Sequence, residues 1–240
     1  MPDTVLEFKH VNKRYGNVPI LQDISFQLRE GEAFGLVGVN GAGKTTLLKC
    51  LLDLCAVDSG DIKIHGAPNT LQGSRSDLAF LPERFAPPYY LTGNDFIRYM
   101  LALQNVPYQD QAVEAMLVAL DLARSALALP VRSLSKGMTQ KLGLAACLLS
   151  GKKFTLLDEP TSGLDPKARA LLKVQLRHLK SQKRTLFLTS HALTDVEEIC
   201  DRMALLHEGT LRFVGTPQEL CQRYQTSSLE QAFLACIETV

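Results

Sequence analysis

The sequence Gly38-Val-Asn-Gly-Ala-Gly-Lys-Thr45 decides the fold of this chain. It follows Ala33–Val37, which is apolar as a buried strand is, and it opens Lys44–Leu54, which has the apolar density of a buried helix. GxxxxGK[ST] between a strand and a helix is the pattern of a phosphate-binding loop, whose backbone N–H groups turn toward an anion at the helix N-terminus. The residues expected to bind a nucleotide here are Gly38, Asn40, Gly41, Ala42, Gly43, Lys44, Thr45 and Thr46.

Within this loop, two side chains have chemistry of their own. Lys44 supplies a point charge for the β- and γ-phosphates, and the Thr45 hydroxyl is placed to ligate Mg²⁺. An eight-residue match in its proper setting favours this interpretation strongly over a glycine-rich turn that precedes a helix by chance. We therefore expect a site for ATP and Mg²⁺.

Two adjacent carboxylates follow another apolar run, Phe154–Leu157. Successive strand residues point to opposite sides, so Asp158 and Glu159 are expected to differ in role. Asp158 can hold Mg²⁺ through its water shell, and Glu159 can polarise a water for attack on the γ-phosphate. Alone, the pair would equally suit a solvated strand end. Beside a phosphate loop it predicts a site of ATP hydrolysis.

Strand and helix patterns alternate along most of the chain. Thr4–His10 and Ile20–Leu28 alternate as half-buried strands do, and helices are expected at Pro166–Ser181 and Leu193–Ile199. Further strands are expected at Asp61–His65, Leu78–Leu81, Phe154–Leu157, Thr185–Leu188 and Met203–Leu206. This pattern predicts an α/β fold, a P-loop NTPase core with a mainly parallel sheet covered on both faces and an N-terminal antiparallel β region.

The middle third of the chain has a different character. Residues from about Asn94 to Ala128 show helical periodicity, broken at Pro107. We expect residues 1–240 to form a single domain, with a helical subdomain inserted at about 84–150 and a helical tail at about 210–240.

Composition excludes several classes of protein. The 240 residues carry a net charge of +1, which gives no global attraction to nucleic acid, and no nucleic-acid partner is expected. No run approaches the roughly 20 apolar residues of a membrane span, and the N-terminus lacks the apolar core of a signal peptide. The chain is therefore expected in the cytosol, reaching a membrane only through a partner. The six cysteines form no CxxC pair and are expected to be free thiols.

Taken in order, these segments resemble the nucleotide-binding domain of ABC transporters over nearly the whole chain. Leu134-Ser-Lys-Gly-Met138 stands in the place of the family's signature segment, Ser162–Asp165 in that of its D-loop, and His191 in that of its switch histidine. Tyr15 occupies the place of the aromatic that stacks on adenine.

The resemblance implies a head-to-tail dimer with two ATP molecules between the subunits. Each phosphate loop would face Ser135 and Gly137 of the other subunit, with Asp165 at the interface and His191 on the γ-phosphate, where it holds the attacking water. From the residues alone, Ser135 and Asp165 are helix caps, and capping is compatible with these roles.

Two segments depart from the family pattern. The signature is usually LSGGQ, so Lys136 replaces a glycine and Met138 an amide donor. Lys136 can add charge near the partner's phosphates or face solvent, and the sequence does not decide between them. Glu83 stands where the family commonly has glutamine, and it can still reach Mg²⁺ as an oxygen ligand with a full charge. Both variants look like those of a subclass of exporters, which favours export over import on analogy.

The leading hypothesis is the ATPase motor subunit of a membrane transporter, paired with itself or a related chain at the cytoplasmic face of the membrane. Its permease would be a separate chain. The segment Phe85–Tyr90, rich in proline and aromatic residues, is a plausible docking surface or an ordinary loop. One alternative is a soluble ABC ATPase acting on ribosomes, DNA or cluster assembly. Another is a module that holds ATP without hydrolysing it, which would be expected to lack Glu159 or His191.

Overall fold

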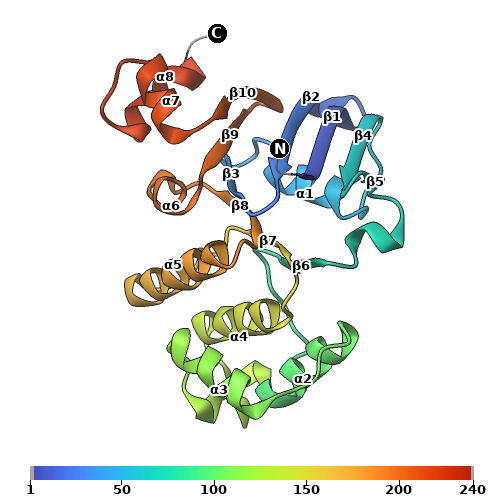
Figure 1. The fold of residues 1–240 in the computed structure, drawn as a ribbon, viewed down its shortest axis with the longest axis vertical. Coiled ribbons are helices and arrows are strands. Elements are labelled where there is room, and N and C mark those ends of the chain that lie inside the picture. The colour runs from blue at the N-terminus through green and yellow to red at the C-terminus, as the bar shows by residue number, and fades with distance from the viewer. Residues whose placement is uncertain (1–2, 239–240) are drawn as a thin grey trace.

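An antiparallel sheet occupies one side of the computed structural model, which describes residues 3–238 (Figure 1). Its order is β2-β1-β4-β5, with strands at Thr4–Tyr15 (β1), Val18–Arg29 (β2), Ser59–Ile64 (β4) and Ala67–Pro68 (β5). β1 and β2 are longer than the sequence predicted. Their ladder continues through several register shifts to a tight turn at Gly16, where φ is +58°, and these bulges disrupt the alternation that marks a strand.

The second sheet is mainly parallel, as predicted. Its order is β10-β9-β3-β8-β7-β6, and only β10 runs antiparallel to its neighbour. The strands are Ala33–Val37 (β3), Leu78–Leu81 (β6), Phe154–Asp158 (β7), Thr185–Ser190 (β8), Arg202–His207 (β9) and Thr210–Gly215 (β10). The chain order and strand order differ, so segments far apart in sequence meet at the same edge.

Alternate residues of the parallel strands enter two different cores. Phe34 and Phe187 belong to the core between the two sheets, and buried residues of α1 (Lys44–Leu51) belong to the same core. Within it, Phe34 stacks on Phe26 with 5.2 Å between the ring centroids. Leu186 and Leu188 belong to the core on the opposite face. Helices cover that face: α5 (Pro166–Ser181), α6 (Leu193–Ile199), α7 (Pro217–Arg223) and α8 (Leu229–Glu238). The sheet is thus covered on both faces, but on one of them largely by another sheet.

Helix α1 ends at Leu51, three residues earlier than the sequence predicted. The amide of Leu54 hydrogen-bonds the carbonyl of Lys49, and Asp53 adopts a φ of +58°, so the chain turns back on the last helical turn. The apolar pattern continues past this point because Cys55 still packs against the core.

The middle third forms a helical subdomain with a core of its own, seen below the parallel sheet in Figure 1. Its helices are α2 (Gly93–Leu103), α3 (Asp110–Ala119) and α4 (Lys136–Leu149), with short 3₁₀ turns η2 (Arg124–Leu127) and η3 (Val131–Ser133); another, η1 (Gln72–Arg75), precedes β6. α4 is buried on two faces. Ala146 faces the subdomain core, and Leu144 faces the core of the parallel sheet.

The prediction of a helical tail at about 210–240 is wrong about where the helix begins. Residues Thr210–Gly215 form the edge strand β10, which pairs with β9, and helix begins only at Pro217. Thr216 and Glu219 form a capping box there, which fixes the boundary. All six cysteines are free thiols, as predicted. No helix within residues 3–238 combines the length and the apolarity of a membrane span.

Candidate nucleotide site

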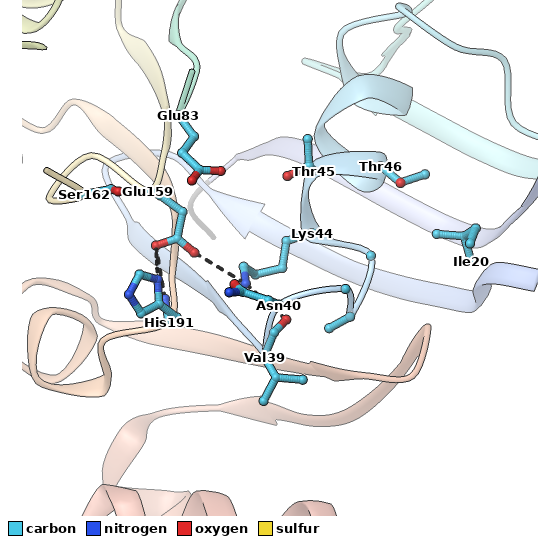
Figure 2. Close-up of a pocket in the computed structure, with 13 residues that line it drawn as sticks. Ile20, Val39, Asn40, Lys44, Thr45, Thr46, Glu83, Glu159, Ser162 and His191 are labelled. Atoms are coloured by element: carbon cyan, nitrogen blue, oxygen red, sulfur yellow. Dashed lines mark hydrogen bonds and ion pairs between the residues drawn. The ribbon is translucent and has the colours of Figure 1, made fainter. Parts of the chain in front are cut away.

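The loops that follow β3, β6, β7 and β8 meet at one edge of the parallel sheet. These four strands are neighbours in the order β3-β8-β7-β6, so their carboxyl ends lie side by side. They open onto a cavity of about 530 Å³, shown in Figure 2. The cavity is lined by Ile20, Val39, Asn40, Gly41, Ala42, Gly43, Lys44, Thr45, Thr46, Glu83, Glu159, Ser162 and His191. The carboxyl edge of parallel strands is the usual ligand site in open α/β sheets.

The glycines of the phosphate loop are required by close backbone contacts. Gly43 has a φ of +111°, and a Cβ at Gly38 would lie 2.3 Å from the carbonyl oxygen of Leu206. Any larger residue at Gly38 would push the loop off β9. α1 begins directly after Gly43, so its N-terminus faces the cavity as an anion site.

Lys44 is held at the floor of this cavity. Its side chain is 7% exposed, and its Nζ donates a hydrogen bond of 2.6 Å to the carbonyl oxygen of Gly38. The same ammonium lies 3.4 Å from Oε1 of Glu159. A buried ammonium and carboxylate that partner each other avoid the cost of an uncompensated buried charge. Both side chains lie close to where phosphates would enter.

Glu159 links Lys44 to His191. It follows the last residue of β7 with a φ of +48°, an uncommon conformation for a residue with a side chain. Its Oε2 accepts from the backbone N–H of His191 at 3.2 Å and lies 2.8 Å from the ring Nδ1 (Figure 2). The carboxylate is buried while the His191 ring is 60% exposed. The pair therefore joins a fixed acid to a ring that can reach a ligand.

Asp158, Thr45 and Glu83 line a second hollow of about 430 Å³ beside the cavity. Burial raises the pKa of Asp158, and the charges of Glu83 and Glu159 raise it further, against a hydrogen bond of 2.6 Å from the Thr189 hydroxyl. A bound cation would relieve this charge repulsion.

The donors in this hollow fit Mg²⁺, which prefers hard oxygen ligands. Within residues 3–238, no three or more His, Cys, Asp or Glu side chains form a group that could hold a metal ion.

Six predicted residues lie outside the cavity lining: Asp158, which lines the second hollow, and Gly38, Tyr15, Ser135, Gly137 and Asp165. Ser135 caps α4 by accepting from the N–H of Met138 at 3.2 Å, and Asp165 caps α5 by accepting from that of Ala168 at 2.9 Å. The latter bond lowers the pKa of Asp165. The capping predictions are thus confirmed, and neither residue contacts the cavity of its own chain. Gly137 sits beside the carbonyl oxygen of Gly163, so the signature segment and the D-loop are neighbours.

Tyr15 is half exposed on the antiparallel sheet. Its hydroxyl lies 3.9 Å from Sγ of Cys55, and its ring does not line the cavity. Ile20 of β2 lines the cavity near Thr46 instead. An aliphatic residue on a strand carries no sequence signal for a ligand, so Ile20 was missed.

The two departures in the signature segment have contacts in their own chain. The stem of Lys136 covers Gly163, since a Cβ on that glycine would lie 3.2 Å from Cε of Lys136. Met138 packs against the core of the helical subdomain. The methionine therefore takes up an apolar role that a glutamine amide would not fill.

Thr189 also escaped prediction. Its hydroxyl donates to Asp158 and its oxygen accepts from the backbone N–H of Glu159 at 2.9 Å, so one buried threonine orients both acids. The signal available in the sequence was a threonine at the polar end of the apolar run Thr185–Leu188.

Comparisons with known proteins agree with this architecture. Residues 21–162 match the family model described as ABC transporter. A solved structure described as the ATP-binding subunit of an ABC transporter superposes with a TM-score of 0.88 at 27% identity, covering 97% of this chain and 99% of that one.

Curated relatives give the same family. The chain is 38% identical over 206 residues to an uncharacterised ABC transporter ATP-binding protein of Synechocystis sp., covering 85% of this chain but only 58% of that protein. It is 33% identical over 220 residues to the Nod factor export ATP-binding protein I of Rhizobium etli, covering 90% and 70% of the two chains. The corresponding Burkholderia lata protein is 34% identical over 226 residues, covering 92% and 74%. This chain belongs to the ATP-binding domains of the ABC transporter family, whose members are ATPases that drive transport.

Proposed function

We propose that this chain binds ATP with Mg²⁺ and hydrolyses it as the motor of a transporter. The observation that carries the proposal is the position of Glu159, whose two carboxylate oxygens face Lys44 and His191 at 3.4 and 2.8 Å. An acid held between a phosphate-binding lysine and an exposed imidazole can order and polarise a water beside a γ-phosphate.

The chain's own groups divide this work. Backbone N–H groups of Gly38–Thr45 and the N-terminus of α1 bind the phosphates, and Lys44 leaves the Gly38 carbonyl to neutralise them. Glu159 takes a proton from the attacking water, and His191 holds that water on the other side. Thr45, Asp158 and Glu83 would hold Mg²⁺, which supplies charge neutralisation at the phosphates. Tyr15 is proposed to contact the adenine from the rim.

A second subunit completes the site. Ser135 is exposed, and both it and Gly137 lie outside the cavity of their own chain, at the start of α4 where backbone N–H groups favour an anion. Head-to-tail pairing would bring this segment and the D-loop residue Asp165 to the nucleotide of the partner. The partner is a second copy or a related chain.

The proposed permease contact lies beside Glu83. Phe85 is anchored in the fold, because a Cβ at Gly143 of α4 would lie 2.6 Å from its ring. The loop beyond it presents Tyr89 and Tyr90, which are 65% and 70% exposed with ring centroids 5.6 Å apart. Exposed tyrosines suit a protein interface. A membrane subunit docked there would hold this chain at the cytoplasmic face.

Export is the proposed direction of transport. The relatives from Rhizobium etli and Burkholderia lata bear the name Nod factor export, and Lys136, Met138 and Glu83 are the variants that favoured export from sequence. The molecule carried is set by the membrane subunit.

The test uses the purified wild-type chain. Light scattering after gel filtration should show a monomer in the absence of nucleotide and a dimer in the presence of ATP and Mg²⁺. Release of phosphate from ATP should require Mg²⁺. Absence of both dimer and turnover would contradict the proposal. Purification in mild detergent should carry a multi-span membrane protein with the wild type and less of it with Tyr89→Ser and Tyr90→Ser together. Stimulation of turnover by nucleic acid would instead favour a soluble ABC ATPase.

A further inference from the structure

A buried carboxylate on α6 contacts the segment that follows Glu159. Asp195 is 4% exposed, and its Oδ2 accepts a hydrogen bond of 2.8 Å from the hydroxyl of Thr161, which is 6% exposed. Its Oδ1 lies 2.7 Å from Nζ of Lys173 on α5. None of these three residues lines the nucleotide cavity.

Thr161 and Asp195 lie close in sequence to Glu159 and His191. Thr161 lies two residues after Glu159, and Asp195 lies four residues after His191. Both connections are short. Ser162 N–H bonds the carbonyl oxygen of Glu159 at 2.9 Å in a turn, and Asp195 lies in the first turn of α6, where its N–H bonds the carbonyl oxygen of Ala192 at 3.2 Å. The Thr161–Asp195 bond is therefore a second tie between the two segments that the Glu159–His191 contact joins.

The Glu159–His191 contact alone is poorly shielded from solvent. The His191 ring is 60% exposed, and Glu159 stands at a φ of +48°, a conformation that persists only when the surroundings hold it. In the Thr161–Asp195 hydrogen bond, both side chains are buried. A hydrogen bond to a buried carboxylate is a strong one, and breaking it leaves a charge partly unsatisfied.

Lys173 holds Asp195 in place. Burial alone would lower the pKa of Lys173, but hydrogen bonds to Asp195 and Glu198 outweigh it and leave that pKa above its usual value. Glu198, which is 46% exposed, takes the outer side of the same ammonium at 3.0 Å and also pairs with Arg177. Asp195 thus faces a threonine on one side and a lysine on the other, and the exposed side chains, Glu198 and Arg177, lie at the outer end of this network.

We propose that the Thr161–Asp195 hydrogen bond is a positioning contact for hydrolysis, which fixes Glu159 and Ser162 relative to His191 while leaving nucleotide affinity unchanged. It rests on the proposed function. The phosphate loop, which supplies most of the binding, lies on β3 and α1 and has no part in the network. A fault in the network should therefore appear in kcat and not in KM.

The experiment compares three variants of the full chain by steady-state ATP hydrolysis with Mg²⁺ and by thermal unfolding. Thr161→Val keeps the side-chain shape and removes the hydroxyl. It should lower kcat by about ten-fold or more, since displacements of about 1 Å at a reacting group cost this much, with KM within about two-fold. Thr161→Ser restores the hydroxyl and should recover at least about half of the wild-type kcat. Glu198→Gln removes the exposed ion pairs of Lys173 and should leave kcat within about two-fold.

Asp195→Asn serves where Thr161→Val does not fold. Its amide oxygen still accepts from Thr161, but the charge that pairs with Lys173 is lost, so its kcat should fall below that of Glu198→Gln. A wild type that hydrolyses ATP beside a Thr161→Val variant of equal kcat would overturn the positioning role. So would a fall in Thr161→Val that Thr161→Ser does not recover. A wild type without turnover would instead overturn the proposed function on which this inference rests.

Discussion

The cavity at the sheet edge and the signature segment are held in opposite ways. Lys44 and Glu159 are buried, contact each other, and are fixed by loops from three neighbouring strands. Ser135 and Lys136 are exposed, and Ser135 is held at the start of α4 by hydrogen bonds from the N–H groups of Met138 and Thr139. The first region is arranged by its own chain. In its own chain Ser135 begins α4 as its N-cap, Lys136 covers Gly163 and Met138 packs into the helical subdomain. A fall in kcat without loss of stability on changing Ser135 would therefore point to a second subunit.

The largest effect should come from breaking the buried region. Glu159→Gln keeps the shape and removes the charge that takes a proton, so kcat should fall by about 100-fold or more. Binding of ATP should persist, because the phosphate loop and Lys44 are retained. Phosphate release and calorimetric titration with ATP and Mg²⁺ measure the two. Light scattering should then show a dimer that persists with ATP, and an unchanged kcat would contradict the role of the carboxylate.

A smaller effect is expected at Ser135, where two variants separate helix capping from the proposed contact with the partner's nucleotide. Ser135→Ala loses the cap and should destabilise the protein by about 1 kcal/mol. Ser135→Asp keeps a good cap, so its melting temperature should match the wild type, but it directs a negative charge at the partner's phosphates. We expect its kcat to fall by about ten-fold. Equal kcat in Ser135→Asp and wild type would leave capping as the whole function of this serine.

The same contrast explains what the sequence could predict. The phosphate loop and the pair Asp158–Glu159 follow apolar strands whose ends are easily recognised, and the structure places Lys44, Glu159 and His191 together at one edge. The mainly parallel sheet followed from the same apolar runs. Local spacing was sufficient because each residue lies within a few positions of a strand end.

Other features depend on contacts that no local pattern reveals. The extension of β1 to Tyr15 rests on pairing across bulges, and β10 rests on pairing with β9. Ile20 reaches the cavity only because the antiparallel sheet is packed against the phosphate loop. The hydroxyl of Thr189 meets Asp158 only through the order of strands in the sheet. These are tertiary facts, and each involves residues far apart in the chain.

The smallest effect is expected at Glu83, which lines both the nucleotide cavity and the hollow beside it. Glu83→Gln should keep Mg²⁺-dependent ATP binding, because Thr45 and Asp158 remain as oxygen ligands, and kcat at pH 7 should change by less than about three-fold.

The sharper difference between Glu83→Gln and wild type lies in pH. Burial is the main cause that raises the pKa of Asp158, and the charge of Glu83 raises this pKa further. As pH falls, a proton therefore displaces Mg²⁺ from Asp158 at a higher pH than an ordinary aspartate would allow. Removing the charge of Glu83 lowers that pKa, so the loss of Mg²⁺-dependent binding should move to lower pH in the variant. Titration of ATP binding with and without Mg²⁺ across the acid range measures the shift. A variant that no longer responds to Mg²⁺ at pH 7 would show that the metal needs the carboxylate itself.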